Sequence, residues 1–131
     1  LGPKLMPLRA ITKLKALLNE NTSWAKNRSS KEIKRMLSTS DVVISVWKNK
    51  KLIGFGRATT DKVYRAVLWD IVVEKKHQKL GIGKEIVKSL LSHRLISKVE
   101  KIYIMTSEFD GFYSKMGFKL EENQKLMLLE K

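Results

Sequence analysis

Cysteine is absent from this chain of 131 residues. Its absence excludes disulfides, metal sites built on thiolates and covalent catalysis through a cysteine nucleophile. The two histidines, His77 and His93, have no partners at metal-ligand spacing, so we expect no metal site. We expect His77 to be an exposed loop residue, with electrostatic tuning of the following loop as the alternative, and His93 to complement a helix dipole.

Long apolar runs are also missing, because no stretch approaches the roughly 20 residues that a membrane-spanning helix needs. The hydrophobic share of 43% is nevertheless that of an ordinary globular protein, and the length suits one core. Residues 1–4 are too short and polar for a signal peptide, and Gly2-Pro3 matches a remnant of tag cleavage. We therefore expect a single soluble domain over residues 1–131, located in the cytoplasm.

Acidic residues are few: 13 face 27 lysines and arginines, which gives a net charge of +14. A surface of this kind attracts anions over long range. A nucleic acid partner is not expected, because the sequence lacks an aromatic stacking motif, zinc spacing and a clear helix-turn-helix. Two alternatives stay open: a phosphorylated ligand that gains from the positive field, or lysines that only solvate the surface.

Apolar periodicity predicts a mixture of helices and strands. The expected helices span residues 7–19, 30–37, 83–93 and 110–116; the expected strands span 42–47, 52–58, 64–73 and 101–105, with a final hairpin from 118–120 and 126–129. Ser29 and Glu32 form a capping box before the second helix, and Gly117 is a left-handed cap after the last one. The pattern predicts an α/β (α+β) domain.

The strand at 64–73 is apolar nearly throughout, with Asp70 as its exception, and should therefore be central to the sheet. The helix between 64–73 and 101–105 makes these two strands parallel neighbours. The loop after the first of them then lies at the carboxyl edge of the sheet, where ligands usually bind.

That loop reads Gln78-Lys79-Leu80-Gly81-Ile82-Gly83. Backbone amides at a helix N-terminus, with the helix dipole behind them, supply the converging donors that a pyrophosphate needs. Gly81 and Gly83 remove Cβ atoms where the backbone must approach the ligand, and Lys79 and Lys84 add positive charge. The structural alternative is a tight turn that enters a helix.

Three features together resemble the GNAT superfamily of N-acetyltransferases. They are the order of these elements, the loop pattern Gln-x-x-Gly-x-Gly, and the segment Phe112-Tyr113-Ser114-Lys115-Met116-Gly117-Phe118. The resemblance covers roughly residues 8 to 130. Within the superfamily, Arg57-Ala58-Thr59 and the run from Tyr64 to Val73 look most like small cyanobacterial and plastid members, which include plant plastid enzymes that acetylate serotonin or protein lysines.

This resemblance implies a mixed, mostly antiparallel sheet with helices on both faces and a central splayed parallel pair of strands. It implies acetyl-CoA as co-substrate, no metal, direct transfer in a ternary complex, a location in the cytoplasm or a plastid stroma, and in many members a homodimer. Pantetheine would lie between the splayed strands. The implied cofactor-binding residues are Ile71, Val72, Val73, Gln78, Lys79, Leu80, Gly81, Ile82, Gly83 and Lys84.

The resemblance also implies catalytic roles. Asp70 matches an aspartate implicated in catalysis in the plastid relatives, and we expect it to act as base through a water, with a pKa raised by burial. The alternative is an aspartate that hydrogen-bonds backbone near a β-bulge. Tyr113 matches the tyrosine that acts as general acid near the sulfur in many members; the alternative is a core tyrosine.

The acceptor amine is less determined. Trp24, between the first two helices, is the expected substrate contact, whereas Trp47 is expected in the core. The relatives carry an acid where this chain has Thr106, and Glu108 or Asp110 could substitute for it. The expected acceptor is an arylalkylamine such as serotonin or a protein lysine; the alternatives are an aminosugar phosphate, a polyamine, or a CoA-binding regulatory module without turnover.

Overall fold

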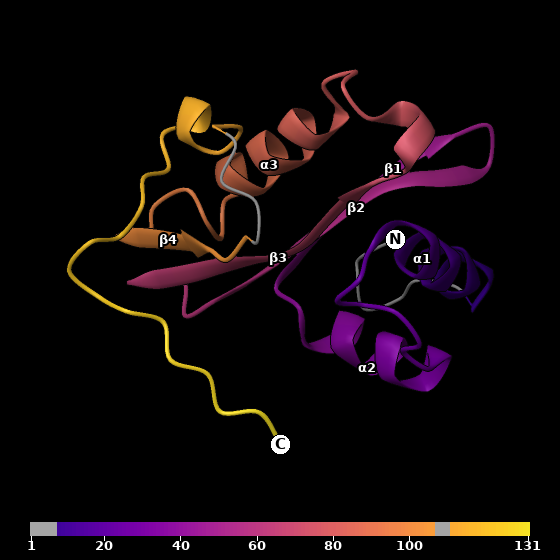
Figure 1. The fold of residues 1–131 in the computed structure, drawn as a ribbon, viewed down its shortest axis with the longest axis horizontal. Coiled ribbons are helices and arrows are strands. Elements are labelled where there is room, and N and C mark those ends of the chain that lie inside the picture. Colours follow the sequence, from indigo (N-terminus) through magenta and orange to yellow (C-terminus); the bar gives the residue numbers. More distant parts are fainter. Residues whose placement is uncertain (1–7, 107–110) are drawn as a thin grey trace.

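The computed structural model describes residues 8–106 and 111–131, which form a four-stranded sheet with helices on both faces (Figure 1). In chain order the elements are α1 (Leu8–Asn21), α2 (Ser30–Thr39), β1 (Val42–Lys48), β2 (Lys51–Thr60), β3 (Arg65–Val73), η2 (Lys75–His77), α3 (Ile82–Ser92), β4 (Lys101–Ile104) and η3 (Ser114–Met116). The strand order is β1-β2-β3-β4, with antiparallel pairing up to β3 and parallel pairing of β3 with β4. The expected fold class is confirmed.

Two apolar cores cover the two faces of the sheet. Helices α1 and α2 pack on one face, where Leu14, Leu18, Ile33, Phe55 and Val72 are buried. Helix α3 packs on the other, where the buried residues include Ala58, Leu68, Ile86, Leu90 and Ile96. Full burial of one such large side chain contributes about 1.5–3 kcal/mol to stability. The sheet is therefore anchored on both sides (Figure 1).

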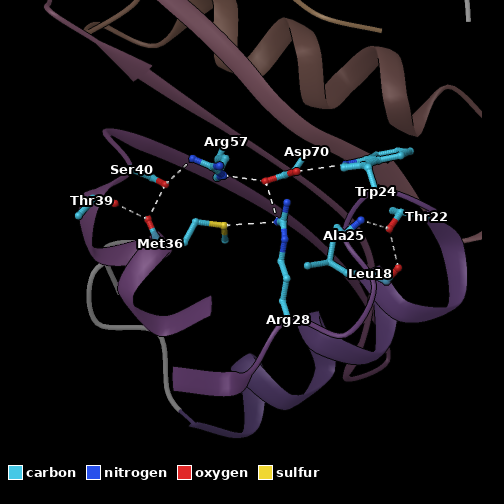
Figure 2. Close-up of polar contacts among 10 residues, drawn as sticks. All are labelled: Leu18, Thr22, Trp24, Ala25, Arg28, Met36, Thr39, Ser40, Arg57 and Asp70. Carbon is cyan, nitrogen blue, oxygen red and sulfur yellow. Dashed lines mark hydrogen bonds and ion pairs between the residues drawn. The ribbon is translucent and has the colours of Figure 1, made fainter. Parts of the chain in front are cut away.

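The loop between α1 and α2 is fixed at both ends by hydroxyl groups. Thr22 Oγ1 donates to the carbonyl of Leu18 at 2.8 Å and accepts from the amide of Ala25 at 3.1 Å (Figure 2). Ser29 Oγ accepts from the amide of Glu32 at 3.1 Å, as the capping box predicts, but the Glu32 carboxylate accepts from the Ser29 hydroxyl. The segment between these anchors is held close to the sheet.

The strands predicted at 42–47 and 52–58 are present as β1 and β2, which form a hairpin with a two-residue turn at Asn49 and Lys50. Both residues have positive φ, of 50° and 69°, which suits the twist of a tight hairpin. The expectation that Trp47 lies in the core is wrong: it is 41% exposed, next to a register shift, and its ring lies 5.5 Å from Lys13 Nζ. An irregularity in strand pairing redirects side chains, and sequence alternation does not reveal it.

Strand β3 contains a β-bulge at Asp70, which has φ of 54°. Two residues, Asp70 and Ile71, stand opposite Gly56 of β2 where one would be regular. The extra residue inverts the alternation of side chains: Leu68 packs in the α3 core, whereas Val72, four residues later, packs in the α1/α2 core. Strand β3 reads as apolar nearly throughout because both of its faces are covered, and the bulge changes which of its positions face each core.

The predicted final hairpin is wrong. Residues 117–131 are described throughout and contain neither helix nor strand, and Leu126, Met127, Leu128 and Leu129 are each at least 77% exposed. Among the described residues the outer edge of β4 is unpaired, so strand propensity alone does not make this segment join the sheet. The short helix expected before this segment is present as η3, and Gly117 after it has φ of 99°, as a left-handed cap requires.

Within residues 8–106 and 111–131, no helix is both long enough and apolar enough to cross a membrane. The longest, α1, has 14 residues.

Candidate active site

The side chain of Asp70 is held by three residues from two other parts of the chain. Its Oδ2 accepts from Arg57 Nε at 2.8 Å and from Arg28 Nη1 at 3.3 Å, and its Oδ1 accepts from Trp24 Nε1 at 3.2 Å (Figure 2). Trp24 and Arg28 belong to the loop between α1 and α2, and Arg57 belongs to β2. Asp70, Arg28, Arg57 and Trp24 are called the Asp70 cluster below.

The charge of Asp70 is set by two opposing effects. Burial favours the neutral acid and raises the pKa, because the carboxylate is only 5% exposed. The hydrogen bonds and charges of Arg57 and Arg28 outweigh it, and the pKa of Asp70 is lowered from its ordinary value. The expectation of a raised pKa is therefore wrong, and Asp70 is ionised at neutral pH. The alternative interpretation, in which Asp70 hydrogen-bonds backbone near a β-bulge, is right about the bulge, but the partners of the carboxylate are side chains.

A pocket of about 260 Å³ adjoins the Asp70 cluster on the α1/α2 face. It is lined by Arg28, Glu32, Ile33, Met36 and Arg57. Arg57 is further oriented by Ser40 Oγ, 3.4 Å from its Nη1, and by the ring of Trp69 at 5.7 Å. Two walls of the pocket are therefore guanidinium groups that also hold Asp70. Trp24, predicted to contact the acceptor, is 56% exposed beside them.

The glycine loop has the shape of an anion site. Lys79 and Gly81 have φ of 68° and 85°, and Gly81 directly precedes α3 as its N-cap without a side-chain hydrogen bond. Among the described residues, the amides of Ile82, Gly83 and Lys84 have no hydrogen-bond partner. Unpaired amides at the positive end of a helix dipole fit a pyrophosphate.

Among residues 8–106 and 111–131, none pairs as a strand with the β4 side of β3 beyond Leu68. The parallel pairing ends at Leu68 and Ile104, while β3 continues to Val73. The backbone of Ile71 and Val72 on that side can therefore pair with an extended ligand, as the resemblance implies. The carbonyl of Val73 accepts from Gln78 Nε2 at 3.1 Å, and Leu80 is 68% exposed in the loop that follows.

Glu74 ties the start of this loop to the rest of the molecule. It is 7% exposed, and its carboxylate pairs with Lys51 Nζ at 2.6 Å and His77 Nδ1 at 2.9 Å. The hydrogen bond from Lys51 is the main cause that lowers the pKa of Glu74. His77 has a side chain only 18% exposed, so the expectation of an exposed loop histidine is wrong. His93 instead caps α3, and its Nδ1 accepts from the amide of Leu95 at 3.2 Å.

Tyr113 lies on the segment after β4, away from the loop that carries Trp24. It is partly buried against the α3 core, with the rings of Phe112 and Phe118 at 4.8 and 6.0 Å in edge-to-face contact. Phe112 also lies over Gly83, at 3.5 Å from an added Cβ. Tyr113 therefore lies on the α3 side of the sheet and Asp70 contacts the α1/α2 side.

Thr106 is exposed two residues after β4. Glu108 and Asp110, considered as substitutes for the missing acid, lie outside the described residues. No group of three or more potential metal-binding side chains occurs in the described ranges.

Sequence reasoning missed Arg28, Arg57 and Glu74. The two arginines lie 42 and 13 residues before Asp70, and no local pattern links them. Glu74 carried a usable signal, because it is the only acid between Val73 and Lys84 in a strongly basic stretch. A lone acid among cations is often paired with them.

Residues 39–120 match the family model described as an acetyltransferase (GNAT) domain. A ycf52 protein of Pyropia yezoensis, named as an uncharacterized N-acetyltransferase, is 33% identical over 106 residues, which cover 77% of this chain and 60% of the relative. The chloroplastic GCN5-related N-acetyltransferase 2 of Arabidopsis thaliana is 36% identical over 73 residues, which cover 55% and 28%. The chain thus spans about 60% of the length of the ycf52 relative.

A solved structure from Xanthomonas campestris pv. campestris, described as belonging to the GNAT family, shares the fold. Its TM-score is 0.80 at 23% identity, over 97% of this chain and 87% of that one. At this identity the likeness concerns the fold alone. The match of the family model to most of the described sheet, with the glycine loop and the open end of β3, shows that this chain belongs to the GNAT acetyltransferase family.

Proposed function

We propose that this chain is an acetyl-CoA-dependent N-acetyltransferase that transfers acetyl directly to a primary amine, either an arylalkylamine such as serotonin or a protein lysine. The observation that carries the proposal is the set of unpaired amides at the start of α3, placed directly after the strand whose β4 side is open. A ligand with a pyrophosphate and an extended, amide-bearing arm fits both features at once.

The binding roles follow from this placement. Amides from Lys79 to Lys84 would hold the pyrophosphate, with the side chains of Lys79 and Lys84 adding charge. The backbone of Ile71, Val72 and Val73 would pair with pantetheine. Trp24 and Thr106 would contact the acceptor.

Acetyl-CoA supplies an activated thioester: the amine nitrogen bonds to its carbonyl carbon, and the carbon–sulfur bond breaks to release a thiolate. Asp70 takes the proton that the nitrogen loses, through a water, and Tyr113 gives its phenolic proton to the sulfur. Solvent then restores both groups. The charges balance, because one proton enters at Asp70 and one leaves from Tyr113.

The lowered pKa of Asp70 limits when it can act. An alkyl ammonium is too weak an acid for an ionised aspartate to deprotonate efficiently, so the acceptor first loses one proton to solvent and attacks as the neutral amine. Asp70 accepts the second proton, from a nitrogen that has begun to bond with carbon and has become more acidic. The arginines keep the carboxylate ionised and fix its direction. Orientation of the proton acceptor is therefore the larger part of its contribution.

The test is acetyl-CoA-dependent release of free thiol in moderate salt, with serotonin, tyramine, spermidine, glucosamine 6-phosphate and a lysine peptide as acceptors. We expect stimulation by serotonin, tyramine or the peptide, and calorimetric binding of acetyl-CoA without any acceptor. Binding without turnover would favour a regulatory module. Absence of acetyl-CoA binding would refute the proposal.

A further inference from the structure

The pocket beside Asp70 is lined by guanidinium N–H donors that have no hydrogen-bond partner among the described residues. Arg28 forms hydrogen bonds through Nη1 alone, to Asp70 Oδ2 and to Met36 Sδ at 3.8 Å. Arg57 uses Nε and Nη1, to Asp70 and Ser40. Among the described residues, Nε and Nη2 of Arg28 and Nη2 of Arg57 have no hydrogen-bond partner. Each guanidinium carries five N–H donors in a planar fork that matches carboxylate and phosphate oxygens.

The charges at this end of the pocket do not cancel. Two arginines share the single carboxylate of Asp70, and both contact the same oxygen, Oδ2. One positive charge is left over in a site where Arg57 is 15% and Arg28 32% exposed. A partly buried excess charge attracts a counter-ion more strongly than a solvated one, because water screens it less.

The remaining residues that line the pocket are apolar or acidic, so the pocket is positive at the arginine end only. Ile33 and Met36 supply apolar surface from α2, and Glu32 is an exposed acid that accepts from the Ser29 hydroxyl at 3.1 Å. An anion is therefore favoured by the two arginines and opposed by Glu32. The opposite effects of these two charges on one ligand make the site testable.

We propose that this pocket binds a carboxylate or phosphate group carried by the amine acceptor, with Arg28 and Arg57 as the specificity-determining residues. This inference rests on the proposed function, since it assigns the part of the acceptor that does not react. The reacting amine then lies towards Asp70 and Trp24. Of the acceptors proposed above, a lysine with a nearby carboxylate or phosphate is therefore preferred over serotonin, and cationic amines such as polyamines are disfavoured.

The test uses pairs of acceptors that share the same reactive amine and differ only in the distant charge. Nα-acetyl-lysine and Nα-acetyl-lysinamide differ by a carboxylate, and glucosamine 6-phosphate and glucosamine differ by a phosphate. We expect at least one anionic partner to have a kcat/KM about tenfold or more above that of its neutral twin, mainly through KM. The pair that shows the preference tells carboxylate from phosphate.

Two variants of the pocket should act in opposite directions. Arg28→Gln should raise the KM of the anionic twin about tenfold and change that of the neutral twin little, with Arg28→Lys intermediate. Glu32→Gln should lower the KM of the anionic twin. Equal losses for both twins in Arg28→Gln would mean that Arg28 acts only through Asp70, and would overturn the inference.

Equilibrium binding of the four compounds by calorimetry separates this inference from the proposed function. Preferential binding of an anionic twin without turnover would support the pocket and contradict the enzyme. Turnover with equal kcat/KM for the twins of both pairs would support the enzyme and refute the anion pocket. Neither binding preference nor turnover would refute both.

Discussion

Arg57 Nε lies 2.8 Å from Asp70 Oδ2, and this contact joins the two strands at the point where one has an extra residue. The Arg57 guanidinium binds the carboxylate of the bulge residue, and its own position is fixed by the ring of Trp69 and the hydroxyl of Ser40. Asp70 is thus a structural centre as well as the proposed proton acceptor. The two roles predict separate measurable losses.

Asp70→Asn should reduce kcat at least about 100-fold, because the amide cannot accept the proton, and should leave the dissociation constant of acetyl-CoA unchanged. Thiol release and calorimetry measure the two quantities. Arg28 and Arg57 would keep no anionic partner in the cluster, so we also expect a loss of about 3 kcal/mol in the free energy of unfolding. Unchanged kcat in a folded Asp70→Asn protein would remove Asp70 from the mechanism.

Acid should weaken the wild-type protein through the same group. The pKa of Asp70 is lower in the folded than in the unfolded chain, so the stabilisation is fully present above the unfolded value of about 4 and is lost as pH falls through the folded value. The melting temperatures of wild type and Asp70→Asn should therefore differ most above pH 5, and the difference should shrink as the pH falls below 4. A constant difference across this range would contradict the lowered pKa.

Gly81→Ala should weaken acetyl-CoA binding. Gly81 has φ of 85° and open space around an added Cβ, so alanine changes the backbone preference of the loop without a clash. Gly117, with φ of 99° and the same open space, is the matched control. Both alanine variants should lose about 1–2 kcal/mol of stability. Only Gly81→Ala should raise the dissociation constant of acetyl-CoA; equal effects of both variants on binding would contradict the role of the loop.

Glu74→Gln should also raise the dissociation constant of acetyl-CoA, by severalfold, because the loop after β3 loses its ties to Lys51 and His77. Lys51→Met is the control, since it breaks one tie and leaves the Glu74–His77 contact. We expect a smaller effect from Lys51→Met. Unchanged calorimetric binding in Glu74→Gln would mean that the loop holds its shape without the carboxylate.

Gly56→Ala should destabilise the sheet, because a Cβ there would lie 2.7 Å from Ile86 Cγ2 and 2.8 Å from Ile71 Cδ1. The expected loss is about 1–3 kcal/mol, measured by denaturant unfolding. Ile71→Val removes the Cδ1 atom, so the double variant should be less destabilised than the sum of the single variants. Simple additivity would show that Ile71 does not press on Gly56.

Local chemistry explains which features the sequence revealed. The cap at Ser29, the turn at Asn49 and the loop around Gly81 depend on residues within a few positions of one another, so propensity and spacing predicted them. The Asp70 cluster depends on contacts across 13 to 46 residues. Its effect on the pKa was therefore predicted with the wrong sign, since burial was visible in the sequence and the two arginines were not.

Strand propensity failed for residues 126–129 for a related reason. Their apolar run is typical of a strand, yet each of these side chains is at least 77% exposed. An apolar run shows that a segment could be buried in a sheet, but whether it packs there depends on contacts with the rest of the molecule that the run itself does not encode. The regular part of β3 was predictable, but its bulge depended on Gly56 in another strand.

The extra residue in β3 also determines how this strand should respond to the loss of one residue. Many substitutions between Trp69 and Val73 alter one side chain and leave its neighbours on their own faces. Removal of the Asp70 codon would restore regular alternation with Ile71 and Val73 still towards α3 and Val72 still towards α1 and α2. One short deletion would thus keep the linings of both cores and remove the proposed proton acceptor, which predicts that the extra residue serves the site more than the packing of the strand.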